Sequence, residues 1–598
     1  MAWNLRKACL AALAFAVTLG GCLSATYAGA AAPVRSLAHQ VSASSADARA
    51  CGSMVSFPAG TAGQIMAGKL TIKPFPAATI GQGAVDWSMD PFHDPTWRLD
   101  FRWGQWIEAL IERYQAGGSH ASAYRARAKA ILKTWITDVP IADKNPLTAI
   151  CSAQVFPGEA WIHNEIPVLL DYYAAHWQGA YNHGLSQDLE LLKAGCAYPA
   201  GHWGGKPKTW RKTALAHMTA SFEPNMYGPA VDAQGVSNEQ ATGYANFTFG
   251  LWTTAESDLR ACGLSLPGWI TGRIAKMPLF LALATQPDGK LVQIGDTYRI
   301  APRNRAHTPL RFAATRGAQG TAPSRRVGVY AAGYVFGRSA WGTASTFGSQ
   351  SFYSLRFGPG TQIHGHADHM GLTYYARGRN LIVNAGHTGY ANTPYRAYLL
   401  SPEASSVLVM PGIPFRPAAA TRLVSSDVRA KAQFYEFHDT AFGGLPRSRS
   451  VYVDQNPDLI LVFDRASGAS SYEQLWHLDP SLSVTSVTAS TAVATAPGTQ
   501  LVLKQVPLPG QRIPSGSTRA VGGFVSRAQN QRTHAPIVTM TRSGASAAML
   551  TLIAPTARGV PVHTSIAAAG GDRYRLRVTI GGKSLSFLVT SEGQIRQN

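Results

Sequence analysis

The residues with the clearest capacity for chemistry are three histidines and one aspartate within six positions, His364, His366, Asp368 and His369. An apolar run that predicts a strand follows them and ends near Gly386. His364 and His366 are two positions apart, a spacing that on a strand directs both imidazole rings to one face of the sheet. Two such rings can bind one metal ion or transfer protons. We therefore expect a functional site here, the alternative being two rim histidines without a role.

A second candidate group is the pair Asn182 and His183, which precedes Gly184 at the predicted start of a helix. The backbone N–H groups of a first helical turn are free to bind an anion. An amide and an imidazole at that position can therefore receive a carboxylate. The alternative is an ordinary helix start with Asn182 as the cap.

A third candidate group lies in 238–259, which the apolar spacing predicts to be one helix. Glu239 and Tyr244 lie on this predicted helix, and Gln240, Tyr244 and Phe247 share another of its faces. A tyrosine acts as an acid or a base when its pKa is lowered or a proton acceptor lies close by. The alternative is a core tyrosine without a chemical role.

The elements that position these groups fall into two halves. Residues 81–320 show a helical period in successive segments joined by short connections, which predicts stacked helical hairpins, either a bundle or an α/α toroid. The predicted helices are 99–116, 121–135, 158–177, 185–194, 209–222, 238–259 and 270–284.

The second half, 321–598, is predicted to be all β. Short β-branched and aromatic runs alternate there with Gly, Pro, Asn and Asp, which is typical of a sandwich of two antiparallel sheets. The predicted strands include 351–357, 381–383, 406–410, 432–437, 450–453, 459–463, 500–505 and 574–580. The expected fold class is therefore α+β multidomain, with the helical domain first.

The charge of the chain indicates its partner. The 598 residues carry 54 Lys and Arg against 33 Asp and Glu, a net charge of +21. A protein this basic attracts polyanions. For an exported chain, the expected polyanion is an acidic polysaccharide or an anionic envelope surface rather than nucleic acid.

Export is predicted from residues 1–32, where Arg6 and Lys7 precede an apolar run and then small residues, as in a bacterial signal peptide. Two processing sites are compatible with this segment: a lipobox ending at Cys22, which would be lipidated, and an ordinary cleavage site near Ala28. The chain would then be secreted, periplasmic or anchored to the envelope by lipid. Residues 33–80 are predicted to be a tether and a segment that leads into the helical domain.

Four further cysteines agree with an oxidising compartment: Cys51, Cys151, Cys196 and Cys262. They can form two disulfides in three alternative pairings. Buried free thiols are the other interpretation.

Eight motifs, four in each half, together resemble the heparinase II/III-like family of polysaccharide lyases, which includes heparin, heparan and alginate lyases. They are DPFHDPTWRLDF at Asp90, NHGLSQDLELL at Asn182, DAQGVSNEQATGYANF at Asp232, PDGKLVQIGD at Pro287, HGHADHMGL at His364, LIVNAGHTGY at Leu381, YRAYL at Tyr395 and EQLWHLDP at Glu473. The resemblance implies an α/α toroid followed by an antiparallel β-sandwich. It also implies cleavage of uronate-containing chains by β-elimination.

The resemblance assigns the proton-transfer site to four residues. Asn182 and His183 would bind the substrate carboxylate. Tyr244 would act as the acid, and for some stereochemistries also as the base. His364 would be the other proton-transfer or charge-stabilising group.

Four further residues would support this site. Glu239 would support the residues that contact the substrate, and Arg396 would bind the substrate or hold its own loop. Tyr398 is a further candidate proton donor. His366 is expected to have a structural role.

The chain departs from the family at the zinc site that several members carry. The resemblance places the first ligand at His366, but Asn384 and Ser405 stand where an aspartate and a histidine are expected. An amide and a hydroxyl are poor zinc ligands. We therefore predict no zinc there and no other cofactor, with His366 hydrogen-bonded to Asn384. Asp368 and His369 leave room for a different metal.

The predicted function is an exported lyase for an acidic, uronate-containing polysaccharide, with a nonsulfated polymer favoured. The alternative is a non-catalytic protein that binds acidic glycan or assists exopolysaccharide assembly on the same scaffold. A glycoside hydrolase is disfavoured because it needs two carboxylates at one bond and Glu239 has no evident acidic partner in the sequence.

Overall fold

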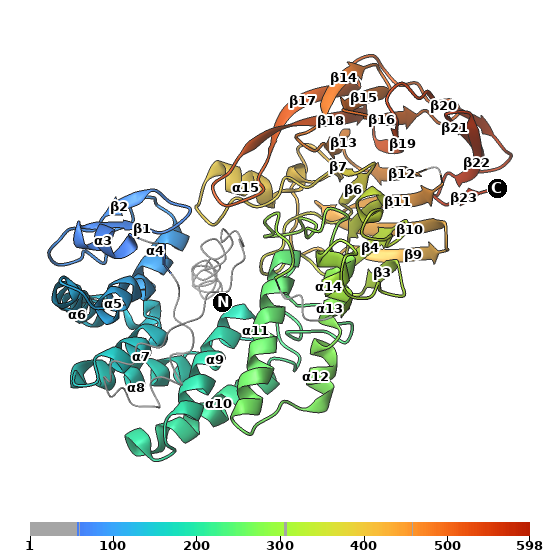
Figure 1. Cartoon of the computed structure of the whole chain (residues 1–598). Helices are drawn as coiled ribbons and strands as arrows, with labels where there is room; N and C mark the ends of the chain where they lie inside the picture. Colours follow the sequence, from blue (N-terminus) through green and yellow to red (C-terminus); the bar gives the residue numbers. More distant parts are fainter. Residues whose placement is uncertain (1–56, 59, 304–307, 457) are drawn as a thin grey trace. The chain divides into compact units, whose positions relative to one another are not determined.

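The computed structural model describes residues 57–58, 60–303, 308–456 and 458–598 (Figure 1). The predicted signal peptide, Cys22, Cys51 and most of the tether lie outside these residues. The chain forms two compact units, one of residues 1–225, 251–270 and 389–393, the other of residues 226–250, 271–388 and 394–598. The two units interleave along the chain, and the domain boundary at 320 stays a prediction.

The first unit is built from helical hairpins, because α5 packs on α6, α7 on α8 and α9 on α10. The architecture is the α/α toroid that the sequence predicts. It opens with α3 (Thr61–Met66), β1 (Lys69–Thr71) and β2 (Ala77–Thr79). The main helices are α4 (Pro95–Trp103), α5 (Glu108–Gln115), α6 (Ala121–Asp138), α7 (Pro146–Val155), α8 (Ala160–Ala175), α9 (Asn182–Ala197) and α10 (Lys206–Ala220). Helices α11 (Thr242–Ala261), α12 (Gly268–Ile274), α13 (Met277–Leu283) and α14 (Thr308–Ala314) follow along the chain.

The predicted helices differ from the observed ones by a few residues at their ends, and three differ more. Segment 99–116 is split into α4 and α5 at Gly104, whose φ of 74° places it in the left-handed region and whose missing Cβ would lie 2.9 Å from Nε1 of Trp135. Segment 270–284 is split into α12 and α13, and Pro278 lies in the first turn of α13. Helix α11 begins at Thr242, so the prediction that Glu239 and Gln240 lie on it is wrong.

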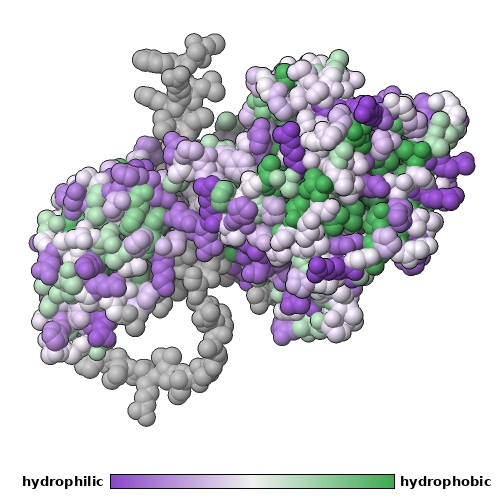
Figure 2. All heavy atoms as spheres, turned by 90° about the horizontal axis from the view of Figure 1, so that it is seen from above, coloured by the Kyte–Doolittle hydropathy of each residue, from purple (hydrophilic) through white to green (hydrophobic). Residues whose placement is uncertain are grey.

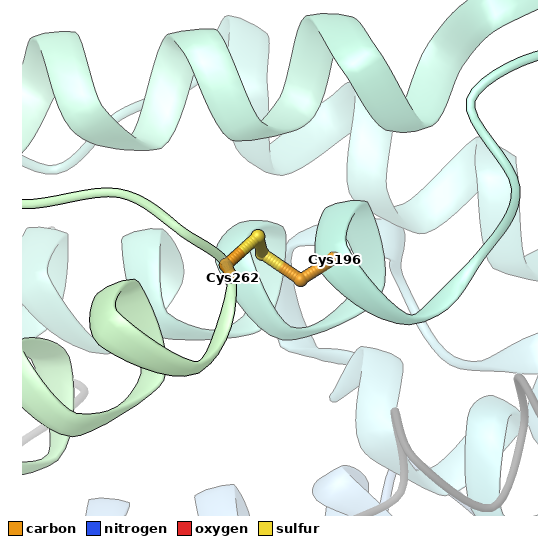
Figure 3. The surroundings of a disulfide bond; sticks show 2 residues. All are labelled: Cys196 and Cys262. Carbon is orange, nitrogen blue, oxygen red and sulfur yellow. A yellow bond between two sulfur atoms is a disulfide. The ribbon is translucent and has the colours of Figure 1, made fainter.

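A disulfide joins two helices of the first unit (Figure 3). Cys196 lies near the end of α9 and Cys262 directly follows α11, and their Cα atoms are 5.6 Å apart. This is one of the pairings that the sequence allows, and the free-thiol interpretation is wrong for these two residues. The bond closes a chain segment of 66 residues.

The second unit holds the antiparallel sheets. Its strands are β3 (Val327–Tyr330), β4 (Tyr334–Arg338), β5 (Phe352–Arg356), β6 (Leu372–Ala376), β7 (Arg379–Ile382), β8 (Leu408–Val409), β9 (Arg422–Val428), β10 (Ala432–Phe442), β11 (Leu445–Gln455), β12 (Asp458–Ser467), β13 (Ser471–His477), β14 (Ser483–Val487), β15 (Thr491–Ala496), β16 (Thr499–Val506), β17 (Thr518–Val525), β18 (Thr533–Ser543), β19 (Ser546–Thr556), β20 (Val562–Ala568), β21 (Arg573–Ile580), β22 (Lys583–Thr590) and β23 (Ile595–Gln597). The short helix α15 (Pro394–Leu400) lies between β7 and β8. All the predicted strands are present, some with shifted ends.

The strands form a sandwich around an eight-stranded sheet of order β14-β15-β16-β19-β12-β11-β10-β9. Successive side chains along β12 point to opposite faces of this sheet, and both faces are buried. Ile460 and Val462 belong to the core shared with the sheets β3 to β7 and β17-β18-β13-β8. Leu459, Leu461 and Phe463 belong to a second core, against the sheet β20-β21-β22-β23. The C-terminal strands therefore add a third layer to the predicted two-sheet sandwich.

The surface is mixed in polarity. Figure 2 shows hydrophilic residues over both units and groups of hydrophobic residues on the strand-rich unit. Valines that are exposed in this unit are Val424, Val428, Val487 and Val521. Within the described ranges, no helix has the length and the apolar character required to cross a bilayer.

Candidate active site

The histidine-rich segment lies in the connection between β5 and β6. The prediction that His364 and His366 lie on a strand is wrong: His364 has a φ of 61°, in the left-handed region. Both imidazoles nevertheless reach one carboxylate, that of Asp296. A loop therefore achieves the convergence that the sequence pattern predicts for a strand face.

Gln240 holds this loop in place through its backbone and its side chain. Its backbone N–H donates to the carbonyl of Ile363 at 3.1 Å. Its Oε1 accepts from the backbone N–H of Gln362 at 2.8 Å, and its Nε2 donates to the carbonyl of Gly360 at 3.0 Å. A Cβ on Gly365 would lie 2.3 Å from Oε1 of Gln240. The glycine between the two histidines is therefore required by this close approach.

His364 is held between two carboxylates and against one aromatic ring. Its Nδ1 lies 3.2 Å from Oδ2 of Asp296, and its Nε2 lies 3.3 Å from Oε2 of Glu239. Burial by itself lowers the pKa of His364, but the hydrogen bonds and charges of Asp296 and Glu239 outweigh it and raise the pKa above its ordinary value. The ring of Tyr244 lies parallel to the imidazole, with centroids 3.5 Å apart and 5° between the planes. The arrangement favours an imidazolium stacked on a phenol.

Asp296 joins His364 to a second group of side chains. Its Oδ1 lies 2.9 Å from Nε2 of His366, 3.0 Å from Nδ1 of His387 and 2.7 Å from Nη1 of Arg396. Burial raises the pKa of Asp296, but Arg396, His387 and the hydrogen bonds from His364 and His366 hold it well below its ordinary range. The carboxylate is therefore ionised, with one oxygen on His364 and the other on the second group.

The family of the strand-rich region follows from its sequence. Residues 350–548 match the family model described as Heparinase II/III-like, C-terminal. This segment is therefore similar to a heparinase II/III-like C-terminal domain. The match confirms the resemblance that the motifs predict. No curated protein matches the sequence.

Solved structures extend the likeness to the whole fold. Heparan sulfate lyase HepC from Pedobacter heparinus is 18% identical with a TM-score of 0.63, and the match covers 92% of each chain. The crystal structure of heparinase III is 14% identical with a TM-score of 0.76, covering 90% of this chain and 92% of that one. At these identities the likeness establishes the fold, a toroid followed by a sandwich.

Five of the predicted site residues come together, three of them within the matched segment: Glu239, Tyr244, His364, His366 and Arg396. Tyr398 is bonded elsewhere, because its hydroxyl lies 3.1 Å from Nε2 of His477. Burial raises the pKa of Tyr398 to about 12. A proton on this phenol is therefore held tightly.

Asn182 and His183 occupy the first turn of α9 in the toroid unit, as predicted. Tyr181 is the N-cap, so the alternative that Asn182 caps the helix is wrong. Both side chains are buried, and Nδ1 of His183 lies 2.7 Å from Oε1 of Gln178. A Cβ on Gly184 would lie 1.9 Å from the carbonyl oxygen of Gly179, which explains the glycine of this motif.

Two residues of the site, Asp296 and His387, were not predicted from the sequence. Each lies in a motif that carries the resemblance, PDGKLVQIGD and LIVNAGHTGY, so the signal was present without an assigned role. Gly295 has a φ of 59°, and its Cβ would lie 2.5 Å from the carbonyl oxygen of His364. This close backbone approach brings Asp296 to the histidine loop, and Asp296 N–H donates to that same oxygen at 2.9 Å.

The residues at the family zinc position do not fit a zinc ion. Asn384 is a neutral amide whose Nδ2 donates to the carbonyl of Gln293 at 3.0 Å, and Ser405 offers only a hydroxyl. The predicted hydrogen bond between His366 and Asn384 is wrong, because His366 bonds Asp296 instead.

The metal-binding alternative for Asp368 and His369 finds no support in their contacts. Asp368 pairs with Arg356 at 3.3 Å, and Nδ1 of His369 lies 3.1 Å from Oγ1 of Thr421. Within the part of the chain that the structure describes, the group able to hold a metal is Asp296, His366 and His387, whose ligand atoms lie within 4.8 Å of one another.

Proposed function

We propose that the chain is an exported polysaccharide lyase that cleaves uronate-containing acidic chains by β-elimination. The observation that carries this proposal is the buried His364, which faces Glu239 and Asp296 and stacks on Tyr244. The fold shared with solved polysaccharide lyases supports the same reaction class.

The reaction makes three demands on the site. The uronate carboxylate must be neutralised so that the proton on C5 becomes acidic. A base removes that proton, the electron pair forms the C4–C5 double bond, and the bond from C4 to the glycosidic oxygen breaks. An acid then protonates the leaving oxygen.

Tyr244 is assigned the proton transfer and His364 the charge. Both nitrogens of His364 face carboxylates, so its protons are held and the imidazolium keeps its charge. A cation whose ring centroid lies 3.5 Å from that of the phenol can stabilise negative charge that develops on Tyr244 during proton transfer. Tyr244 is assigned to removing the C5 proton as the base and then donating a proton to the leaving oxygen as the acid. His364 acts as the charge-stabilising group.

Arg396 is assigned to holding the site rather than to gripping substrate. Its Nη1 is committed to Asp296 Oδ1 at 2.7 Å and to His387 Nδ1 at 2.9 Å. Asn182 and His183 remain the proposed ligands of the substrate carboxylate, since an amide and an imidazole in a first helical turn suit an anion.

The hydrolase alternative is further weakened by the positions of the carboxylates. Glu239 and Asp296 both lie at His364, one at each ring nitrogen. An inverting or retaining hydrolase needs two carboxyl groups facing one glycosidic bond. Here the imidazole of His364, and not a glycosidic bond, lies between the two carboxylates.

The net charge of +21 supports a polyanionic substrate. Residues 1–32, as a signal peptide, support export, and lipidation of Cys22 is one route to the envelope. We favour a nonsulfated uronate polymer. No step of the proposed reaction uses a metal or another cofactor.

The deciding experiment incubates the purified chain with alginate, hyaluronan, heparan sulfate, heparin and bacterial exopolysaccharides. New reducing ends accompanied by the ultraviolet absorbance of a C4–C5 double bond are expected for at least one polymer. Reducing ends without that absorbance would identify a hydrolase. Retained binding without cleavage of any polymer would favour the glycan-binding or exopolysaccharide-assembly function.

A further inference from the structure

Arg396 lies among three side chains that are all typical metal ligands. Its Nη1 is 2.7 Å from Oδ1 of Asp296, 2.9 Å from Nδ1 of His387 and 3.5 Å from Nε2 of His366. One carboxylate and two imidazoles make up the ligand set of many zinc sites, with a fourth position open. In this chain, a guanidinium nitrogen faces the atoms that would coordinate an ion.

The charges of the group agree with a cation at its centre. Nδ1 of His387 lies 2.9 Å from Nη1 of Arg396 and 3.0 Å from Oδ1 of Asp296. Asp296 is ionised and accepts from Arg396. Oδ1 of Asp296 and Nδ1 of His387 therefore both lie against the guanidinium, where they would lie against a metal ion.

The geometry of the triad is close to that of a metal site without matching it. Oδ1 of Asp296 is 2.9 Å from the His366 nitrogen and 3.0 Å from the His387 nitrogen. Zinc bonds to nitrogen and oxygen are about 2.0–2.2 Å long, and a tetrahedral ion would separate its ligands by somewhat more than these distances. The distances among the three side chains and Arg396 are those of hydrogen bonds. If the guanidinium were absent, small movements of the three side chains would admit an ion.

We propose that the guanidinium of Arg396 is a built-in cation that takes the place of a divalent metal ion among Asp296, His366 and His387. Shortening Arg396 converts these three side chains into a site for a transition metal ion such as Zn²⁺ or Co²⁺. Arginine stays charged at every pH the protein meets and cannot be removed by a chelator. The positive charge that Arg396 places at Oδ1 of Asp296 is therefore permanent. Asp296 connects this charge to His364 through its other oxygen, Oδ2. This inference concerns cation binding and does not rest on the proposed lyase activity.

The test measures metal content after chelation and equilibrium dialysis against Zn²⁺, with Co²⁺ absorption as a second readout of the ligand field. The wild-type chain and Arg396→Lys, which keeps a cation, are expected to retain no stoichiometric metal. Arg396→Ala is expected to retain one ion per chain. Arg396→Ala combined with His387→Ala is expected to lose it. Arg527→Ala, which removes a guanidinium from Asp479, is the matched control and is expected to gain no metal.

Two results would overturn the proposal. One is a stoichiometric ion in the wild-type chain that His387→Ala removes, because a metal would then displace Arg396. The other is a folded Arg396→Ala chain that binds no ion. If this variant is unfolded, it and Arg396→Gln are refolded with and without Zn²⁺. Refolding only with the metal supports the proposal, whereas failure of both variants with the metal contradicts it.

Discussion

The rings of Tyr244 and His364 lie parallel, with centroids 3.5 Å apart and 5° between their planes. Tyr244 belongs to the first turn of α11, and His364 belongs to the loop between β5 and β6, more than a hundred residues later. The contact brings a helix and a loop of the sandwich together at one point. The two carboxylates at His364 then set the charge that the phenol meets.

Replacing Tyr244 by phenylalanine tests the hydroxyl without removing the stacked ring. We expect kcat on a cleaved polymer to fall by at least about 100-fold, the usual contribution of one proton-transfer group. The melting temperature should stay close to that of the wild type, because the ring contact with His364 is retained. Tyr375→Phe, which removes a hydroxyl bonded to the carbonyl of Gly348, is the control and should keep full activity. Wild-type kcat in Tyr244→Phe would contradict the assigned role.

Alanine at Gly365 should displace the histidine loop. Its Cβ would lie 2.3 Å from Oε1 of Gln240, a contact that forces the loop or that side chain to move. We expect a lower melting temperature and a large loss of activity, since overpacking typically costs about 1–3 kcal/mol. Gly272→Ala provides the comparison, because its Cβ meets nothing within 4 Å, and thermal melting should show no loss there. Equal stability of the two variants would contradict the role given to the Gln240 contact.

The stability of the helical unit should depend on pH through Asp188. This side chain is 0% exposed, and burial, partly offset by His217, raises its pKa from 3.8 to about 7. The folded state therefore binds the proton more tightly than the unfolded state, so the contribution of Asp188 to stability is greatest below about pH 4 and is lost as the pH rises to about 7. Asp188→Asn should lose less stability than the wild type over this range in denaturant titrations. Asp138→Asn, at an exposed position of α6, should behave like the wild type. A wild-type pH profile in Asp188→Asn would rule out this linkage.

The buried pair Arg449–Asp464 should contribute far more to folding than the exposed pair Arg465–Glu592. In the buried pair both side chains are 0% exposed, and Nε and Nη2 of Arg449 each donate to Asp464 at 2.6 Å. Asp464→Asn leaves a buried guanidinium without its counter-charge and should lower the free energy of unfolding by about 3–5 kcal/mol.

The comparison variant for this pair is Glu592→Gln, whose side chain is 74% exposed. It should change the free energy of unfolding by less than about 1 kcal/mol. Denaturant unfolding followed by circular dichroism measures both variants. Similar losses in the two would show that burial does not decide the value of these ion pairs.

Much of the fold could be predicted from the sequence because local patterns determine it. The period of apolar residues predicts the helices of the toroid. Runs of β-branched and aromatic residues bounded by turn residues predict the strands, as Leu459–Phe463 of β12 illustrates. The sequence did not predict the two interruptions of helices, one at Gly104 and one before α13. Gly104 combines a left-handed φ with a close approach of Trp135, a tertiary contact that leaves no pattern in the sequence of this segment.

The candidate site was likewise predicted only in part from the sequence. Residue types and motif order alone predicted that Tyr244, His364, His366, Glu239 and Arg396 belong to it. Only the tertiary structure decided their partners, because Asp296 and His387 come from separate segments, and Asp296 reaches the histidine loop through the close backbone approach at Gly295. The sequence therefore determined which side chains are candidates for the proposed chemistry. The fold decided that one carboxylate, with a guanidinium on one oxygen and an imidazole on the other, connects these groups.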